Sequence, residues 1–303
     1  MAFPLPRPVG PGSRLAVVAP AGPFNEESFC AGIGWLSERY TVVHRPDIFT
    51  ETGYLAGSDA RRLGELVEAI TDPTIDAIVC ARGGFGTTRL LPDLDPAIVR
   101  EANKLIIGFS DISALHAVWA AAGVRSVHAP MVAALGRAPE VIRERWIDVV
   151  EHPGEARFWD LAPLAPCPNP NASGILTGGN LAVLGALVGT PDMPRLAGCI
   201  LFIEDVGERP YRVDRMLTTM KHAGFFKDLA GLVVGSFSES DPGKDGVTVD
   251  DVIYGHFSEA PFPVLTGFPA GHIEENEPIP FGAEARIEEN RLSILRADTD
   301  NLT

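Results

Sequence analysis

The sequence predicts an α/β protein whose N-terminal half is a mostly parallel sheet with crossover helices. Three observations lead to this prediction. Short apolar runs without charge, such as residues 105–107, are typical of strands buried on both faces. Segments with apolar residues at helical spacing alternate with these runs along the chain. The chain has 303 residues, of which 46% are hydrophobic and 21% charged, so it is long enough for two domains with apolar cores.

The first half contains five predicted strands, at residues 15–20, 41–44, 77–80, 105–107 and 126–128. Helices are predicted between them, over about residues 26–40, from 58 to 71, from Thr87 or Thr88, and after Ser110. Sites in parallel sheets lie beyond the carboxyl ends of the strands. The turn at Pro20–Gly22, the loop Arg82–Gly86 and Ser110 all follow strands, so we expect them to share one cleft.

The second half has a similar alternation after a proline-rich stretch. Strands are predicted near residues 174–180, 199–203, 229–234 and 264–267, followed by a closing hairpin at 285–288 and 292–295. Helices are predicted there over 181–188, from Pro210 and over 249–257, and a further helix over 139–150 precedes the proline-rich stretch. We therefore expect an N-terminal domain over residues 1–135, a linker over 136–171 and a C-terminal domain over 172–303.

Charge and cysteine content limit the partners and the compartment. The chain has 25 basic and 40 acidic residues, a net charge of -15, which argues against nucleic acid or an anionic membrane as partner. Its four cysteines form no C-x-x-C pair, and the sequence has neither a signal-peptide pattern nor an apolar run long enough for a membrane span. We expect a cytoplasmic protein in a reducing compartment.

Ser110 follows the apolar run at residues 105–107 and precedes a helical pattern. A serine on a sharp strand-to-helix turn presents its hydroxyl as a nucleophile, and a helix N-terminus favours developing negative charge. Ser and Asp also cap helices well, so Ser110 or Asp111 is alternatively only an N-cap. As a nucleophile, Ser110 needs backbone donors for an oxyanion. The N–H of Asp111 and an N–H from Gly83 or Gly84 are the candidates.

A nucleophilic serine also needs a histidine base. His272 lies in a loop after a predicted strand and is framed by glycine, which favours it over the helical His116 and His222. His128 at a strand end remains an alternative, as does a merely solvated His272.

The third group is a carboxylate that orients the histidine. Glu204 ends a run of five apolar residues, where a charge requires a partner. Asp205 and Glu208 are rivals, and one of them is alternatively a cap for the helix near Pro210. A phosphate cradle at Arg82–Gly86 and a metal site at His272 are weaker hypotheses, because neither has the standard spacing.

Taken together, these segments resemble the LD-carboxypeptidases, also called muramoyltetrapeptide carboxypeptidases. The matching segments occur in the family's order and cover most of the chain: Val18–Pro23, Ala81–Gly86, Gly108–Asp111, Thr177–Leu181, Glu204–Leu217 and Gly271–His272. The long Glu204–Leu217 block is the most specific of them, and Phe85 departs from the tyrosine expected at its position.

The resemblance implies a Ser–Glu–His triad of Ser110, Glu204 and His272. It implies an oxyanion hole from the N–H groups of Asp111 and Gly84, with Gly83 as the rival glycine. It also implies a flavodoxin-like N-terminal domain, a smaller C-terminal α/β domain of the swivelling β/α type, and a homodimer. Such enzymes remove the terminal D-Ala from cytoplasmic murein tetrapeptides during cell-wall recycling, without metal or other cofactor.

The substrate is the part of this interpretation with rivals. Arg82 or Arg89 is expected to hold the substrate carboxylate, since arginine suits that geometry. Relatives resembling microcin C immunity proteins keep the triad and hydrolyse peptidyl or aminoacyl adenylates, which is the first alternative. A non-catalytic ligand binder on the same fold is the second, and an intact Ser, Glu and His argue against it.

Overall fold

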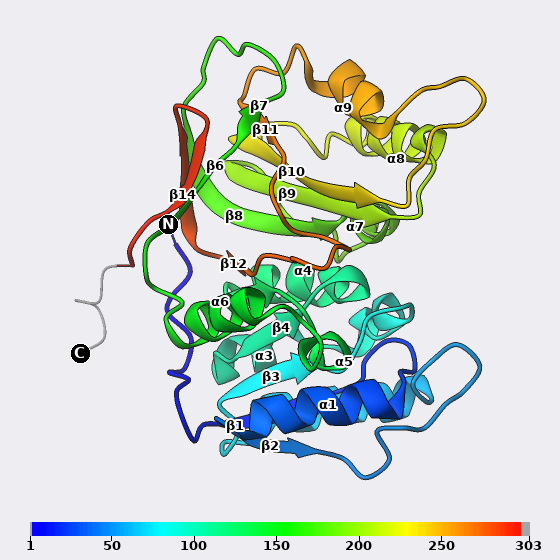
Figure 1. Cartoon of the computed structure of the whole chain (residues 1–303), viewed down its shortest axis with the longest axis vertical. Coiled ribbons are helices and arrows are strands. Elements are labelled where there is room, and N and C mark those ends of the chain that lie inside the picture. The colour runs from blue at the N-terminus through cyan, green and yellow to red at the C-terminus, as the bar shows by residue number, and fades with distance from the viewer. Residues whose placement is uncertain (1, 298–303) are drawn as a thin grey trace. The chain divides into compact units, whose positions relative to one another are not determined.

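The computed structural model describes residues 2–297, and its elements are labelled in Figure 1. They group into two compact units. We call residues 4–153 with 277–281 the N-terminal unit, and the remaining described residues the C-terminal unit. The mixed α/β class, with a parallel sheet and a second sheet domain, is confirmed. None of the helices in residues 2–297 has both the length and the apolar character that a membrane span requires.

The N-terminal unit is a three-layer structure around a parallel sheet. Its strands are β1 (Arg14–Val18), β2 (Thr41–His44), β3 (Ala77–Cys80), β4 (Leu105–Gly108), β5 (Ser126–His128) and β12 (Ile279–Phe281). Among the described residues their order is β12-β5-β4-β3-β1-β2, and only β12 pairs in the antiparallel sense. The parallel part, β2-β1-β3-β4-β5, has the flavodoxin-like order that the resemblance implies.

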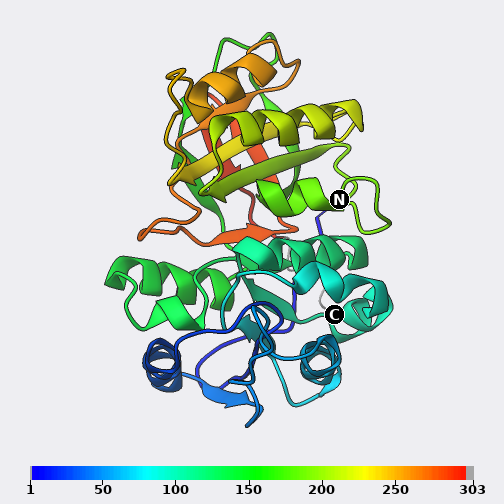
Figure 2. The same cartoon turned by 90° about the vertical axis from the view of Figure 1, so that its right-hand side faces the viewer.

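Helices cover both faces of this sheet. They are α1 (Glu26–Ser37), α2 (Asp59–Thr71), α3 (Pro96–Ala102), α4 (Ser113–Ala122), α5 (Val132–Leu135) and α6 (Glu140–Glu151). One core cluster joins side chains of α1, α5 and α6 to alternate residues of the strands, such as Val17, Val79 and Ile107. Figure 2 shows α1 on one side of the strands. The fully apolar strands β3 and β4 are buried along their whole length, as their composition predicts.

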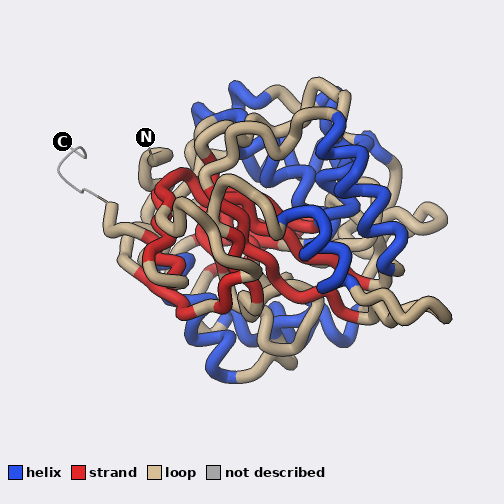
Figure 3. Tube along the Cα trace, turned by 90° about the horizontal axis from the view of Figure 1, so that it is seen from above, coloured by secondary structure: helices blue, strands red, loops and turns tan. Residues whose placement is uncertain are grey.

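The C-terminal unit is built on a mixed sheet. Its strands are β6 (Arg157–Asp160), β7 (Ala162–Pro163), β8 (Ala172–Asn180), β9 (Cys199–Val206), β10 (Gly231–Ser238), β11 (Val264–Thr266), β13 (Glu284–Glu288) and β14 (Arg291–Ile294). Within residues 2–297 they run in the order β6-β14-β13-β8-β9-β10-β11-β7. The central strands β8 to β11 are parallel, and α7 (Leu181–Leu187), α8 (Pro210–His222) and α9 (Val249–Phe257) connect them. Figure 3 distinguishes the strands and helices by colour.

Two segments differ from the sequence prediction, and a third agrees with it. The segment expected as a linker, residues 136–171, contains α6 in the N-terminal unit and β6 and β7 in the C-terminal unit. The helix expected from Thr87 is instead two short 3-10 turns, η1 (Thr87–Arg89) and η2 (Leu91–Asp93), because prolines at 92 and 96 interrupt it. The predicted closing hairpin is confirmed, with positive φ at Glu289 and Asn290 in its turn.

Candidate active site

Ser110 is the first residue of a short 3-10 turn, η3 (Ser110–Ile112), directly after β4. Its φ is 63°, in the left-handed region that non-glycine residues rarely occupy. Such a conformation costs on the order of 1–3 kcal/mol and is concentrated at functional sites. Helix α4 begins at Ser113 with Ile112 at its N-cap, and no described side chain caps it. Ser110 is therefore not the N-cap of α4, and it lies in a strained turn between a strand and a helix.

The glycine loop after β3 lies against this serine. A Cβ built on Gly83 would stand 2.9 Å from Ser110 Cβ and 3.1 Å from Ser110 Oγ, so only glycine fits there. Gly84 has a φ of 116°, which also requires glycine. The N–H of Gly22 donates to the Gly83 carbonyl at 3.1 Å and joins the loop to the turn after β1. Thus three predicted segments of the N-terminal unit meet at the carboxyl ends of β1, β3 and β4.

Two buried charged side chains hold the far end of the glycine loop. The N–H of Thr87 donates to Asp111 Oδ2 at 2.8 Å. Arg62, which has no exposed surface, donates from Nη1 to the carbonyls of Gly86, at 2.9 Å, and of Pro20. Burial raises the pKa of Asp111, while its contacts with Thr87 and the charge of Arg62 oppose that rise.

Arg62 was not singled out from the sequence. In the sequence, apolar residues recur at helical spacing at Leu63, Leu66, Val67 and Ile70, which predicts that they share the buried face of α2. Leu66 and Ile70 are buried, together with Arg62 and Glu65, whereas Leu63 and Val67 are only half-buried. The available signal was that Arg62 and Leu66 are four residues apart and so share one face of a helix. An arginine on a buried helix face requires polar partners, and strand-end carbonyls supply them.

The C-terminal unit contains the predicted acid and base. Glu204 lies in β9, has no exposed surface, and accepts a hydrogen bond at Oε2 from Nδ1 of His272 at 2.8 Å. A Cβ on Gly271 would stand 3.0 Å from Glu204 Oε2, and the φ of Gly271 is 130°. The Gly271 N–H donates to Asn276 Oδ1 at 2.9 Å, and the hydroxyl of Ser238 donates to the His272 carbonyl at 3.0 Å. These contacts define the loop that presents the imidazole.

The rival carboxylates have other partners. Asp205 accepts from Asn180 Nδ2 at 3.0 Å and from the N–H of Ala182 at 2.9 Å, so it organises the start of α7. Burial raises the pKa of Asp205 to about 6. Glu208 forms an ion pair with Arg212 at 3.6 Å. His272 forms its ion pair with Glu204.

Several rival histidines have partners or positions that explain them structurally. His116 in α4 is buried, with Nδ1 2.9 Å from Ser126 Oγ and Nε2 2.9 Å from the Gly108 carbonyl. A carbonyl only accepts, so Nε2 carries the proton and Nδ1 accepts from the serine. His128 is buried next to Phe109 and Phe281, with ring centroids 5.6 and 5.8 Å away. His256 pairs with Asp214 at 2.7 Å.

The two predicted substrate arginines differ in their surroundings. Arg89 forms an ion pair with Asp59 at 2.7 Å, and its Nε also donates to this carboxylate. Arg82 donates from Nη1 to the Pro23 carbonyl at 2.8 Å and lines a pocket of about 520 Å³. The other lining residues are Gly22, Pro23, Tyr54, Gly84 and Phe85. This pocket adjoins the glycine loop, and Arg82 lines it whereas Arg89 does not.

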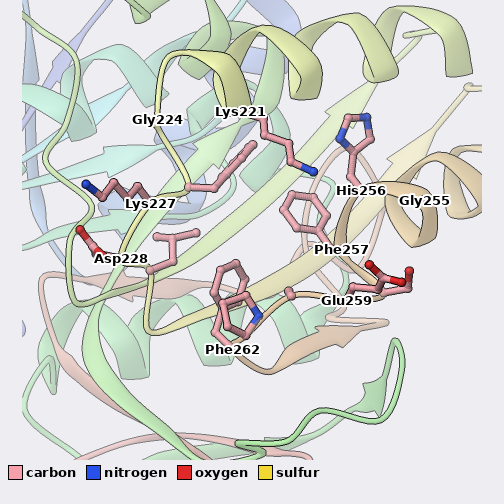
Figure 4. Close-up of a pocket in the computed structure, with 14 residues that line it drawn as sticks. Lys221, Gly224, Lys227, Asp228, Gly255, His256, Phe257, Glu259 and Phe262 are labelled. Atoms are coloured by element: carbon pink, nitrogen blue, oxygen red, sulfur yellow. The ribbon is translucent and has the colours of Figure 1, made fainter.

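A larger pocket of the C-terminal unit, about 820 Å³, lies elsewhere. Figure 4 shows it at the ends of α8 and α9, with Lys221 extending towards Phe257. Its residues Asp228 and Phe262 precede β10 and β11, so it faces the amino ends of the strands. Glu204 lies near the carboxyl end of the parallel strand β9, where sites in such sheets form. Within residues 2–297, no group of three His, Cys, Asp or Glu side chains is arranged to hold a metal ion.

Comparison with known proteins identifies the same two halves. Residues 15–129 match the model of the LD-carboxypeptidase N-terminal domain, and residues 173–287 match that of the LD-carboxypeptidase C-terminal domain. The chain is 32% identical to the murein tetrapeptide carboxypeptidase of Pseudomonas aeruginosa, over 92% of this chain and 94% of that protein. It is 36% identical to a Streptomyces coelicolor protein that is named a putative carboxypeptidase, over 98% of this chain and 95% of that protein.

Solved structures agree with this match. The muramoyltetrapeptide carboxypeptidase of Oxalobacter formigenes superposes with a TM-score of 0.84 at 31% identity, covering 95% of this chain and 100% of that one. The microcin C7 self immunity protein MccF, solved with aspartyl sulfamoyl adenosine, has a TM-score of 0.86 at 23% identity, covering 97% and 99%. At that identity the second likeness shows the fold.

Proposed function

Because this chain belongs to the LD-carboxypeptidase family and is a carboxypeptidase, we propose that it removes the terminal D-Ala of murein tetrapeptide through an acyl-enzyme on Ser110. The observation that carries this proposal is the hydrogen bond between His272 Nδ1 and the fully buried Glu204. With its Nδ1 proton held by a carboxylate, the imidazole has Nε2 as its basic nitrogen.

The reaction follows from these roles. His272 Nε2 takes the Ser110 proton while the hydroxyl oxygen attacks the carbonyl that precedes D-Ala. Glu204 stabilises the imidazolium that forms, because its ionised carboxylate accepts from Nδ1–H. His272 then protonates the leaving amine of D-Ala, and water activated by the same histidine releases the shortened peptide.

The oxyanion would be stabilised by backbone donors of the N-terminal unit. We assign the N–H of Asp111 and the N–H of Gly84, with Gly83 as the rival. The close approach of Gly83 to Ser110 Oγ supports this assignment, since it brings the glycine loop next to the nucleophile. Each such donor contributes on the order of 10²–10³ in kcat in other serine hydrolases.

The proposal requires Ser110 of one unit to meet Glu204 and His272 of the other. The chain connectivity supports such a meeting. Five residues after His272, the chain enters the segment Glu277–Phe281, which belongs to the N-terminal unit. Five residues extend at most about 18 Å. In that segment Ile279 is the register partner of His128, and His128 is the register partner of Gly108, two residues before the nucleophile.

We further assign Arg82 to the terminal carboxylate of the substrate. Its position in the pocket beside Gly84 supports this, and the ion pair of Arg89 with Asp59 makes Arg89 the less available of the two predicted arginines. We propose cytoplasmic cell-wall recycling as the context and a homodimer as the assembly, as the resemblance implies. The name of the Pseudomonas aeruginosa relative, a murein tetrapeptide carboxypeptidase, supports a cell-wall peptide as the substrate.

Release of D-Ala from murein tetrapeptide tests the proposal. Replacement S110A, or H272A, is expected to lower kcat by about 10³-fold or more, because the triad acts as a unit. The matched control is D214N, which removes the carboxylate of the other histidine pair, His256–Asp214, and should leave kcat unchanged. An S110A variant with wild-type turnover would contradict the proposal.

The same assay separates the rival substrate. The likeness of fold to MccF, whose structure contains aspartyl sulfamoyl adenosine, favours an aminoacyl adenylate as the second candidate. The murein proposal predicts D-Ala release and little hydrolysis of the sulfamoyl adenosine. The reverse preference, abolished by the same S110A replacement, would assign this chain to the adenylate hydrolases instead.

A further inference from the structure

The peptide group between Gly86 and Thr87 is held from both sides by buried charged side chains. Its carbonyl, on Gly86, accepts from Arg62 Nη1 at 2.9 Å. Its N–H, on Thr87, donates to Asp111 Oδ2 at 2.8 Å. Arg62 has no exposed surface and Asp111 is 3% exposed, so water does not compete for either bond. One peptide plane is thus fixed by a cation and an anion together.

Both charged side chains also contact the parts that the proposed reaction uses. Asp111 directly follows the nucleophile Ser110, and its own N–H is one proposed oxyanion donor. Arg62 donates to the Pro20 carbonyl as well and pairs with Asp59, so it joins the turn after β1 to the end of the glycine loop. The loop is therefore attached to its neighbours at Gly83 by Gly22, at Gly86 by Arg62, and at the following residue Thr87 by Asp111.

We propose that Asp111 is a positioning residue, whose carboxylate holds the Gly86–Thr87 peptide so that the glycine loop keeps its N–H groups in register with those of the Ser110 turn. This inference rests on the proposed function, since it assigns the loop its catalytic task. Its physical basis is that the N–H groups of Asp111 and Gly84 belong to two separate segments of the chain. The side chain of Asp111 joins these segments through its contact with Thr87, three residues after Gly84.

The conformation of the glycine loop is the reason why the contact of Thr87 with Asp111 matters. The φ of Gly86 is 124°, and a Cβ there would stand 2.8 Å from Arg62 Nη1 and 2.4 Å from Leu55 Cδ2. A loop with positive φ at Gly84 and Gly86 has glycine's full conformational freedom when it is not held. Oxyanion donors stabilise the transition state only when they are already oriented, so a freely moving loop would lower kcat more than it changes KM.

The test compares D111A, which removes the acceptor, with D111N, whose amide oxygen still accepts from the Thr87 N–H. The D111A variant should lower kcat for D-Ala release roughly 30-fold or more, with KM within about threefold. The D111N variant should stay within about threefold of wild type. The matched control is D251A, because Asp251 accepts the Thr248 N–H at 2.9 Å in the other unit, and its loss should leave kcat unchanged.

Hydrogen exchange provides a readout that does not depend on turnover. The Thr87 amide should exchange roughly tenfold faster or more in D111A, and at nearly the wild-type rate in D111N. Unchanged exchange or unchanged kcat in D111A, or an equal loss in D111N, would overturn the proposal. If D111A does not fold, R62K serves instead, because one ammonium cannot replace all the bonds of Arg62, and the same two changes are expected.

Failure of the proposed function would look different. An S110A variant with wild-type turnover would show that Ser110 is not the nucleophile, whatever the exchange rate of the Thr87 amide is. Faster Thr87 exchange in D111A without any change in kcat would mean that Asp111 holds the loop for folding alone, and would overturn its role in catalysis.

Discussion

Glu204 is a carboxylate with no exposed surface, and His272 is its partner. Burying an unpaired charge is costly, so the imidazole and the carboxylate each make the other's position favourable. Glu204 Oε1 has no hydrogen-bond partner within residues 2–297.

Replacing Glu204 by glutamine tests the charge of this side chain. The glutamine side chain keeps the shape of glutamate but loses the charge that stabilises the imidazolium, and its NH2 group can hold the imidazole in the wrong tautomer. We expect kcat to fall by about 10²–10³-fold with little change in KM. The D214N variant is the matched control, and an E204Q enzyme within threefold of it would count against the acid role.

Gly271 is the residue that permits the close contact of Glu204 with this loop. The G271A variant should displace the carboxylate, because its Cβ would meet Glu204 Oε2 at 3.0 Å and Glu204 Cβ at 3.2 Å. We expect a fall in kcat of about tenfold or more. The control is G267A, which has a φ of 83° and nothing within 4 Å of its Cβ. It should lose about 1 kcal/mol of stability but keep its kcat. Equal kcat values for the two variants would show that the contact does not matter.

Single site residues were predictable where a residue does not suit its sequence surroundings, such as a charge at the end of an apolar run. Glu204 at the end of an apolar run and Gly271 next to His272 both signalled a site, and the structure brings Glu204 and His272 together. The partners of Arg62 and the Thr87 contact of Asp111 were not predictable, because they depend on where a loop after β3 passes a helix after β2. Such contacts between distant segments leave no spacing in the sequence.

At the scale of elements, a hydrogen bond joins α4 to β4, the strand that precedes Ser110. His116 bridges the Gly108 carbonyl at the end of β4 and Ser126 in β5. Burial lowers the pKa of His116 from 6.5 to about 4, so this imidazole stays neutral in the folded protein at pH 5 and 6. The hydrogen bond of Nε2–H to Gly108 therefore supports the turn at Ser110 over the usual pH range.

This lowered pKa predicts a specific acid sensitivity. Below pH 6.5 the unfolded chain binds a proton at His116 and the folded chain does not, so this residue's contribution to stability falls as the pH drops from 6.5 to 4. The change is about 3 kcal/mol at most. Urea unfolding of wild type and H116Q should show a difference in free energy that shrinks across this window. A constant difference between pH 4 and 6.5 would contradict it.

Most elements of both sheets follow from apolar runs and helical spacing, but β12 does not. The segment Ile279–Phe281 is short and contains Pro280, which argues against a strand. It is nevertheless the edge of the first sheet, where the missing N–H of proline is tolerated. Sequence patterns place a strand near its chain neighbours, whereas this one pairs with β5, about 150 residues earlier, and most of the C-terminal unit lies between the two in the sequence.

At the scale of the molecule, each unit needs a segment from elsewhere in the chain. Strand β12 belongs to the N-terminal unit, although the residues up to Asn276 and from Gly282 belong to the other unit. The loop that carries His272 therefore continues directly into this edge strand. Phe281 of this strand is 2% exposed and packs against His116 and His128, with ring centroids 5.2 and 5.8 Å away. The stability of the N-terminal sheet and the path of the chain after His272 are therefore linked.

The F281A variant measures how much this strand contributes. Removing a buried phenyl ring should lower the free energy of unfolding by about 3–5 kcal/mol. The control is F158A in β6, where the ring is 61% exposed and the loss should stay below about 1 kcal/mol. Similar values for the two variants in urea unfolding would show that β12 is not part of the folded core.

The central claim is that one hydroxyl of the N-terminal unit is activated by the imidazole and carboxylate of the C-terminal unit. The most direct measurement is a crystal structure of the enzyme after reaction with a peptidyl phosphonate that ends in D-Ala. We expect phosphorus bonded to Ser110 Oγ, with His272 Nε2 within about 3 Å of an oxygen of the adduct and Nδ1 still on Glu204. A phosphonate attached to another residue, or an adduct on Ser110 that His272 does not reach, would contradict the claim.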